Sequence, residues 1–213
     1  MAEEYNPLDY DNLTKNCVQE LMTRGPFIFP MARFQGSGVY ALFYTGGLAF
    51  YSSLRSPDAV LPIYVGKAVP PGARKGLSGG TRSFSLFGRL TEHMHSIGSA
   101  VNLEVADFLC RYLVVTPLWI TMAERFLIEH YRPLWNVWID GFGNHPPGKG
   151  RPAGEISWWD ALHPGREWAT LLRQTRSQAE ASRRVEDFFN LPNEVAKATE
   201  QALGQDGDQT AQA

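Results

Sequence analysis

The stretch GVYALFYTG, residues 38–46, predicts the fold most clearly. It is rich in β-branched and aromatic residues and is flanked by glycines, a pattern typical of a strand between turns. Two further short apolar runs follow it, LAFYSSL at residues 48–54 and LPIYVG at residues 61–66. Three such runs in succession, with turn residues between them, predict an antiparallel meander of three strands.

Helix and strand patterns continue on both sides of this region. A short apolar periodicity predicts a helix within residues 1–33, ended by the breaker Arg24-Gly25-Pro26. Residues 83–98 predict an amphipathic helix, whose apolar stripe consists of Phe84, Phe87, Leu90, Met94 and Ile97. The remaining predicted elements are a strand at residues 107–116 and helices at residues 117–133 and 158–174.

Together these elements predict an α+β fold, with a small antiparallel three-stranded sheet flanked by helices and with helical and loop extensions at both ends. A length of 213 residues suits one domain. We divide the chain into an N-terminal extension at residues 1–33, a core at residues 34–137, a C-terminal extension at residues 138–197 and a flexible tail at residues 198–213. The tail has too little apolar surface to offset its ordering entropy.

Composition and charge exclude several classes of protein. A net charge of −2 argues against a protein that coats polyanions without preference, because such binding needs many excess cations. No apolar run approaches the ~18 residues needed to cross a bilayer, so we expect a cytoplasmic protein. The two cysteines, Cys17 and Cys110, lie far apart and predict neither a zinc site nor a disulfide.

Basic residues are concentrated in one segment, residues 67–93, where Glu92 is the one acidic residue. An anion is therefore expected to bind there. The basic residues of this segment are Lys67, Arg74, Lys75, Arg82 and Arg89.

The candidate site residues each have an ordinary explanation when taken singly. Tyrosines on strands are common in cores, two polar residues four apart often form a solvated helix face, and a polar residue after a helix is often a cap. Their order along the chain is more informative, because it resembles the five motifs of the GIY-YIG nuclease family. The matching residues are Gly38-Val39-Tyr40, Tyr64-Val65-Gly66, Arg89, Glu124 and Asn136. This likeness covers residues 36–137.

Longer segments resemble one subgroup of that family, the type II restriction endonucleases that cut CCGCGG. The segments are RFQGSGVYALFYTG, LPIYVGKAVP, YRPLWN, and DGFGNHPPGKGR followed by HPGREWA. The spacing between Tyr40 and Tyr64 is longer than is usual in the family, so we interpret residues 46–60 as an elaborated hairpin. The resemblance implies a sequence-specific endonuclease that hydrolyses double-stranded DNA at a GC-rich palindrome and leaves 5′-phosphate and 3′-hydroxyl ends.

The resemblance also implies roles for the motif residues. Tyr40 is expected to be the general base for water, Tyr64 to orient water or phosphate, and Arg89 to clamp the phosphate, while His93 relays a proton. Lys67 would lie where a phosphate sits, and Gly66 would let the DNA backbone approach. Tyrosine is a poor base unless a nearby cation lowers its pKa, which Lys67, Arg89 and the metal could do. Glu124 is expected to be the sole protein ligand of one Mg²⁺ or Mn²⁺ ion. Asn136 is expected to hold the phosphate or to support the tyrosines.

Polar residues in two Gly-rich loops are expected to contact DNA. They are Arg74, Lys75 and Arg82 in the first loop, and Asn144, His145, Lys149 and Arg151 in the loop at residues 141–154. Residues 163–168, HPGREW, could contact DNA or could begin a helix with Trp168 packed in the core. A palindromic site implies a homodimer, and restriction implies a companion DNA methyltransferase that protects the same site without forming a stable complex.

Other interpretations make different predictions. A structure-selective repair or recombination nuclease with the same core would cut flaps or branches irrespective of sequence. A non-catalytic DNA-binding module would lack the tyrosines or the metal ligand, which are all present. A small-molecule enzyme with a phosphate-binding strand end would need a glycine-rich phosphate loop, which the sequence lacks.

Overall fold

The computed structural model describes residues 6–72, 83–146 and 154–190. Its centre is a four-stranded antiparallel sheet with the strand order β1-β4-β2-β3. The strands are β1 (Phe27–Ile28), β2 (Gly38–Tyr44), β3 (Tyr64–Ala68) and β4 (Phe108–Val114). The α+β class is therefore confirmed, but the prediction of three strands is wrong.

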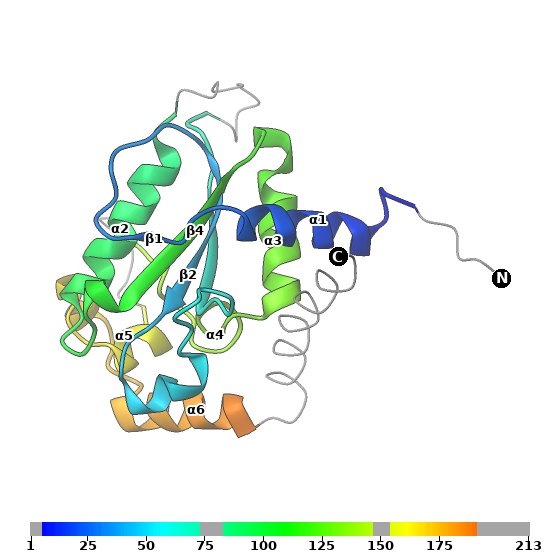
Figure 1. The fold of residues 1–213 in the computed structure, drawn as a ribbon. Coiled ribbons are helices and arrows are strands. Elements are labelled where there is room, and N and C mark those ends of the chain that lie inside the picture. The colour runs from blue at the N-terminus through cyan, green and yellow to red at the C-terminus, as the bar shows by residue number, and fades with distance from the viewer. Residues whose placement is uncertain (1–5, 73–82, 147–153, 191–213) are drawn as a thin grey trace.

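Strand β2 is buried along its whole length because helices cover both faces of the sheet. Side chains alternate along a strand, so Tyr40 and Leu42 pack toward α2 (Ser85–Ser99) on one face. Val39 and Ala41 pack on the other face against α1 (Tyr10–Met22) and α3 (Ile120–Tyr131). Figure 1 shows α2 on one side of the sheet and α1 and α3 on the other. Burial on both faces explains why residues 38–44 show no alternation of apolar and polar residues.

The run at residues 48–54 is not a strand. It contains a 3-10 helix, η1 (Ala49–Leu54), which places Tyr51 and Leu54 in the core. Strand β2 already pairs with β3 on one edge and with β4 on the other, so no edge of β2 is free for this run. The predicted meander is therefore wrong, and the fourth strand is β1, which is only two residues long and pairs with β4.

The helices partly follow the predicted patterns. Helices α1, α2 and α3 lie where helices were predicted, but Phe84 is exposed and the buried positions of α2 are Leu86, Leu90, His93 and Ile97. The helix predicted at residues 158–174 is interrupted at His163-Pro164-Gly165, because proline restricts the residue before it and Gly165 has a φ of +145°. The other helical elements are α4 (Leu134–Val137), α5 (Trp158–Leu162), α6 (Gln178–Asn190), and the 3-10 helices Val105–Asp107, Pro117–Trp119 and Glu167–Leu171.

The C-terminal elements belong to the same hydrophobic core as the sheet. Trp159 of α5 and Val185 of α6 are fully buried in the cluster that contains Tyr40. Helices α5 and α6 lie together at one end of the sheet (Figure 1). Within the described residues, no helix has the length and hydropathy needed to span a membrane.

A buried chain of hydrogen bonds ties η1 to this C-terminal part. Asn102 accepts at 2.8 Å from Nδ1 of His163, whose Nε2 lies 2.6 Å from the hydroxyl of Tyr51. The Tyr51 hydroxyl in turn accepts from the indole N–H of Trp135 at 2.8 Å. These hydrogen bonds give a partner to each of the polar groups that they join, which is the condition for burying such groups at a low cost in free energy.

Falling pH is expected to destabilise the fold through His163. Burial, and then the charge of Arg166, lowers the pKa of His163 from 6.5 to about 3. Below pH 6.5 the unfolded chain therefore binds a proton that the folded chain does not, and the free energy of unfolding falls by about 1.4 kcal/mol per pH unit. Urea unfolding between neutral pH and roughly pH 4.5 measures this slope. His163→Gln should make the slope shallower by about one histidine's contribution; an unchanged slope would contradict the assignment.

Candidate active site

Two tyrosines on neighbouring strands form the centre of the candidate site. In the β2–β3 register Tyr40 is opposite Gly66 and Leu42 is opposite Tyr64, so the two phenols are diagonal neighbours on one face of the sheet. Their ring centroids are 6.3 Å apart at an interplanar angle of 46°. Both side chains therefore leave the same face of the sheet.

Gly66 has a different role from the predicted one. A Cβ atom on Gly66 would collide with the hydroxyl and the ring of Tyr40, so the space beside Gly66 is filled by this phenol rather than left open for DNA. Strand β3 also continues to Ala68, so Gly66 does not end it. Glycine is required here because the phenol of Tyr40 crosses the backbone of the neighbouring strand.

His93, on α2, makes a direct contact with Tyr40. Its Nε2 lies 2.6 Å from the Tyr40 hydroxyl, and its ring stacks on Phe142 with centroids 4.4 Å apart. Burial, followed by the charges of Arg89, His145 and Arg166, lowers the pKa of His93 well below 6.5. The imidazole is therefore neutral, and Nε2 can accept the hydroxyl proton of Tyr40.

The pKa of Tyr40 is not lowered by the charges of the protein alone. Burial raises this pKa well above 10, the neighbouring Tyr64 raises it further, and the lowering by Arg89 is a smaller effect. Burial likewise raises the pKa of Tyr64, against a lowering by Arg89. The desolvation penalty for a buried phenolate exceeds the attraction of one partly exposed guanidinium. Tyr40 therefore keeps its proton in this structure, where its hydroxyl is hydrogen-bonded to Nε2 of His93.

Arg89 lies one turn before His93 on the same helix face, as predicted. Its Nη2 donates to the carbonyl oxygen of Gly143 at 2.9 Å. Its Nη1 donates to Glu92 at 2.8 Å and to Nε2 of His145 at 2.8 Å. The guanidinium is thus held beside the two phenols by groups from two separate parts of the chain.

Glu124 and Lys67 approach from the other face of the sheet. Lys67 follows Gly66 on β3 and points toward α3, where its ammonium pairs with the carboxylate of Glu124 at 2.6 Å. Glu124 is close enough to the phenols to raise the pKa of both Tyr40 and Tyr64. Lys67 was predicted to lie beside a phosphate. In this structure its ammonium is instead paired with Glu124, the predicted metal ligand.

The donor set around Glu124 can be compared with what divalent cations require. Within residues 6–72, 83–146 and 154–190, no group of three or more His, Cys, Asp or Glu side chains could hold a metal. Mg²⁺ commonly binds through one or two carboxylates and keeps several waters. Glu124 is a partly exposed carboxylate that already attracts a cation, so these residues fit a hydrated hard cation rather than an all-protein cage.

Asn136 supports the strand that carries Tyr64. The backbone N–H of Val65 donates to Oδ1 of Asn136 at 2.8 Å, and Nδ2 of Asn136 donates to the Val65 carbonyl at 2.8 Å. Because β3 is an edge strand, Asn136 takes the place of a neighbouring strand there. Of the two roles predicted for Asn136, these bonds favour support of the tyrosines over contact with a phosphate.

A comparison with protein families matches this arrangement. A family model described as the Eco29kI GIY-YIG domain matches residues 32–189, well over half of the chain. The chain belongs to this family of GIY-YIG restriction endonucleases. A search of curated proteins gives no match.

The DNA contacts expected for this GIY-YIG chain fall mostly outside the described residues. Asn144 and His145 are described and exposed, and His145 contacts Arg89. The others, Arg74, Lys75, Arg82, Lys149 and Arg151, lie outside the described residues, as does the predicted tail.

The segments at residues 140–151 and 163–169, singled out in the sequence for their resemblance and for DNA contact, also contain a group of residues that supports the candidate GIY-YIG site. Phe142 and Gly143 reach His93 and Arg89, and they are held by Arg166, which pairs with Asp160 at 2.6 Å. Arg166 is buried and Trp168 is half-buried beside it, so neither predicted role of residues 163–168 describes this segment fully. A usable signal was present: Asp160 lies within the apolar run WWDAL, and a buried acid needs a buried cation.

Proposed function

We propose that this protein is a type II restriction endonuclease that hydrolyses double-stranded DNA at a GC-rich palindrome, CCGCGG, and leaves 5′-phosphate and 3′-hydroxyl ends. The observation that carries the proposal is the 2.6 Å contact of Tyr40 with a neutral His93, beside Tyr64 and Arg89, in a chain of the GIY-YIG restriction family. The choice of CCGCGG rests on the sequence resemblance alone.

The residues would divide the work of hydrolysis as follows. As Tyr40 takes a proton from the attacking water, it passes its own proton to Nε2 of His93 in the same step, so that no free buried phenolate forms. Tyr64 orients the water or the phosphate. Arg89, with donors in a planar fork, neutralises charge on the phosphoryl oxygens.

Glu124 would hold one Mg²⁺ or Mn²⁺ ion, which supplies positive charge to the phosphate and to the departing oxygen. Lys67 pairs with the same carboxylate, so it is placed to neutralise Glu124 when no other cation is bound. Asn136 keeps the β3 backbone, and with it Tyr64, in place.

The proposed partners follow from the palindrome. A two-fold symmetric site is matched by a homodimer in which each subunit cuts one strand. Asn144, His145 and the basic residues of the two loops would contact DNA. A companion methyltransferase would protect the same sequence in the cytoplasm of the host.

Incubation of plasmid DNA with the protein and Mg²⁺, followed by mapping of the ends, tests the proposal. Discrete fragments with uniform ends at CCGCGG are expected. A smear, or cutting of flaps and branches irrespective of sequence, would instead indicate a structure-selective nuclease. Binding without cutting would indicate the non-catalytic module.

Gly66→Ala is expected to reduce the cleavage rate by roughly 10-fold to 100-fold, with DNA binding retained. The added methyl group must push the Tyr40 hydroxyl away from its place, and an error of about 1 Å in a catalytic group can cost 100-fold. Gly47→Ala is the control, because a Cβ there meets no atom within 4 Å. Equal single-turnover rates for the two variants would show that the position of Tyr40 does not matter.

A further inference from the structure

Residues 141–144 form a turn that contacts the candidate site at two points. The Asn144 N–H donates to the Gly141 carbonyl at 3.0 Å and closes the turn. Inside it, the Phe142 ring stacks on His93 and the Gly143 carbonyl accepts from Arg89. The fit is tight, because a Cβ on Gly143 would lie 2.9 Å from the hydroxyl of Tyr64.

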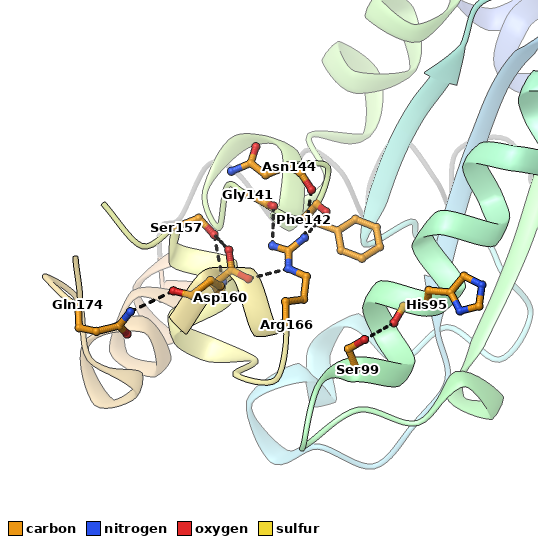
Figure 2. A network of polar contacts seen from close by, with 10 residues as sticks. His95, Ser99, Gly141, Phe142, Asn144, Ser157, Asp160, Arg166 and Gln174 are labelled. Carbon is orange, nitrogen blue, oxygen red and sulfur yellow. Dashed lines mark hydrogen bonds and ion pairs between the residues drawn. The ribbon is translucent and has the colours of Figure 1, made fainter. Parts of the chain in front are cut away.

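Arg166 holds this turn from behind. Its Nη2 donates to the carbonyl of Gly141 at 2.9 Å, and its Nη1 donates to those of Phe142 at 3.1 Å and Asn144 at 3.4 Å. Figure 2 shows the guanidinium pointing into the turn, with the three carbonyl groups converging on it. One side chain thus fixes three of the four residues of the turn.

The guanidinium is itself held rigidly. Nε donates to Asp160 at 2.6 Å, and Asp160 also accepts from the hydroxyl of Ser157 at 2.7 Å. The Arg166 and Asp160 side chains are only 4% and 1% exposed. The Arg166 guanidinium also lies over two indole rings, 4.5 Å from that of Trp159 and 4.7 Å from that of Trp168.

We infer that Arg166 is a positioning residue: through the turn at residues 141–144 it sets the orientation of Arg89 and His93. The inference rests on the proposed function for its effect on cleavage. Arg166 is too deeply buried to contact DNA, and each of its three guanidinium nitrogens already donates to the turn or to Asp160. Lysine would keep the charge beside Asp160 but could not supply the planar fork that reaches several carbonyls together.

Arg166→Lys tests the inference, and Arg184→Lys is a closely matched control. Arg184 also lies over two indole rings, 4.5 Å from Trp138 and 5.0 Å from Trp158, and its Nε donates to the Trp138 carbonyl at 2.9 Å. It belongs to α6 and is partly exposed, so it reproduces the stacking of Arg166 on two indole rings, though not its full burial, without the link to the turn.

Three measurements are compared at equal fractions of folded protein. Arg166→Lys is expected to lower the single-turnover cleavage rate roughly 100-fold, while the Kd for DNA changes by no more than about threefold. Arg184→Lys should leave both within about twofold. In NMR spectra of arginine-labelled protein, the Arg89 side-chain protons should be resolved and slow to exchange in the wild type and in Arg184→Lys, and averaged in Arg166→Lys.

Gly143→Ala is an independent test of the inference. The added methyl group disturbs the turn where the turn meets Tyr64 and Arg89, and the substitution leaves the Arg166–Asp160 pair intact. It should lower the cleavage rate in the same way. Unchanged Arg89 signals in Arg166→Lys, or a rate loss no larger than in Arg184→Lys, would overturn the inference. A wild-type protein that cuts no DNA would refute the proposed function instead, and the Arg89 signals alone would then decide whether Arg166 positions it.

Discussion

Glu124→Gln is expected to leave DNA binding intact and to lower the single-turnover cleavage rate by a factor of about 1,000. Glutamine has nearly the same shape but carries no charge, so the hard cation proposed at this position loses its carboxylate ligand. Such a loss corresponds to several kcal/mol of transition-state stabilisation, at about 1.4 kcal/mol for each factor of ten. Filter binding without divalent ions and quenched-flow cleavage with Mg²⁺ measure the two quantities.

Glu129→Gln is the control for this experiment. Glu129 lies on the same helix, α3, and also forms an ion pair, with Arg125 at 2.7 Å, but its side chain is exposed and the pair is a surface pair worth little to stability. The cleavage rate of the Glu129→Gln variant should be close to that of the wild type. A Glu124→Gln enzyme that cuts within about tenfold of the wild-type rate would remove Glu124 from the proposed chemistry.

Tyr40→Phe is expected to lower the cleavage rate by roughly 100-fold to 10,000-fold, the range typical of losing a general base. The structure contains a second tyrosine–histidine pair for comparison. Tyr51 and His163 also lie 2.6 Å apart between hydroxyl and Nε2, and both residues are fully buried. This pair lies in the core, where the Tyr51 hydroxyl also accepts from Trp135. It therefore has the same hydroxyl–imidazole hydrogen bond as Tyr40 and His93, but it lacks the neighbouring Tyr64 and Arg89.

The two substitutions should therefore give opposite results. Tyr51→Phe leaves the buried Trp135 N–H and His163 Nε2 without a partner, which should lower the free energy of unfolding by about 1–3 kcal/mol and leave the cleavage rate of the folded fraction unchanged. Tyr40→Phe should lose cleavage far beyond any loss of folded protein. If both variants lose activity only in proportion to their stability, Tyr40 is a core residue and not the base.

Much of the fold could be predicted from local patterns, and each failure has an identifiable physical cause. Helix α2 was predicted from its apolar periodicity, helix α3 from Pro117 and Pro133 at its ends, and strand β2 from its β-branched and aromatic composition between glycines. Strand β1 has two residues, too few for any period. Residues 48–54 have the composition of a strand, but the edges of β2 are already paired.

The sequence by itself determined which residue types stand at the motif positions and in what order, including Tyr40, Tyr64, Arg89, Glu124 and Asn136. Those identities follow from the chain alone and are enough to indicate the family. Local patterns also placed Arg89 and His93 on one helix face, because residues four apart on a helix are neighbours.

Only the tertiary structure decided how these groups are charged and paired. Tyr40 and His93 are 53 residues apart, and Asn136 is 71 residues from its partner Val65, so no local pattern contains either contact. Burial then raises the pKa of Tyr40 and lowers that of His93, an effect that counting the nearby cations in the sequence could not reveal. A charge is stabilised or penalised by the solvent that folding removes from it, and that depends on which distant segments pack around it.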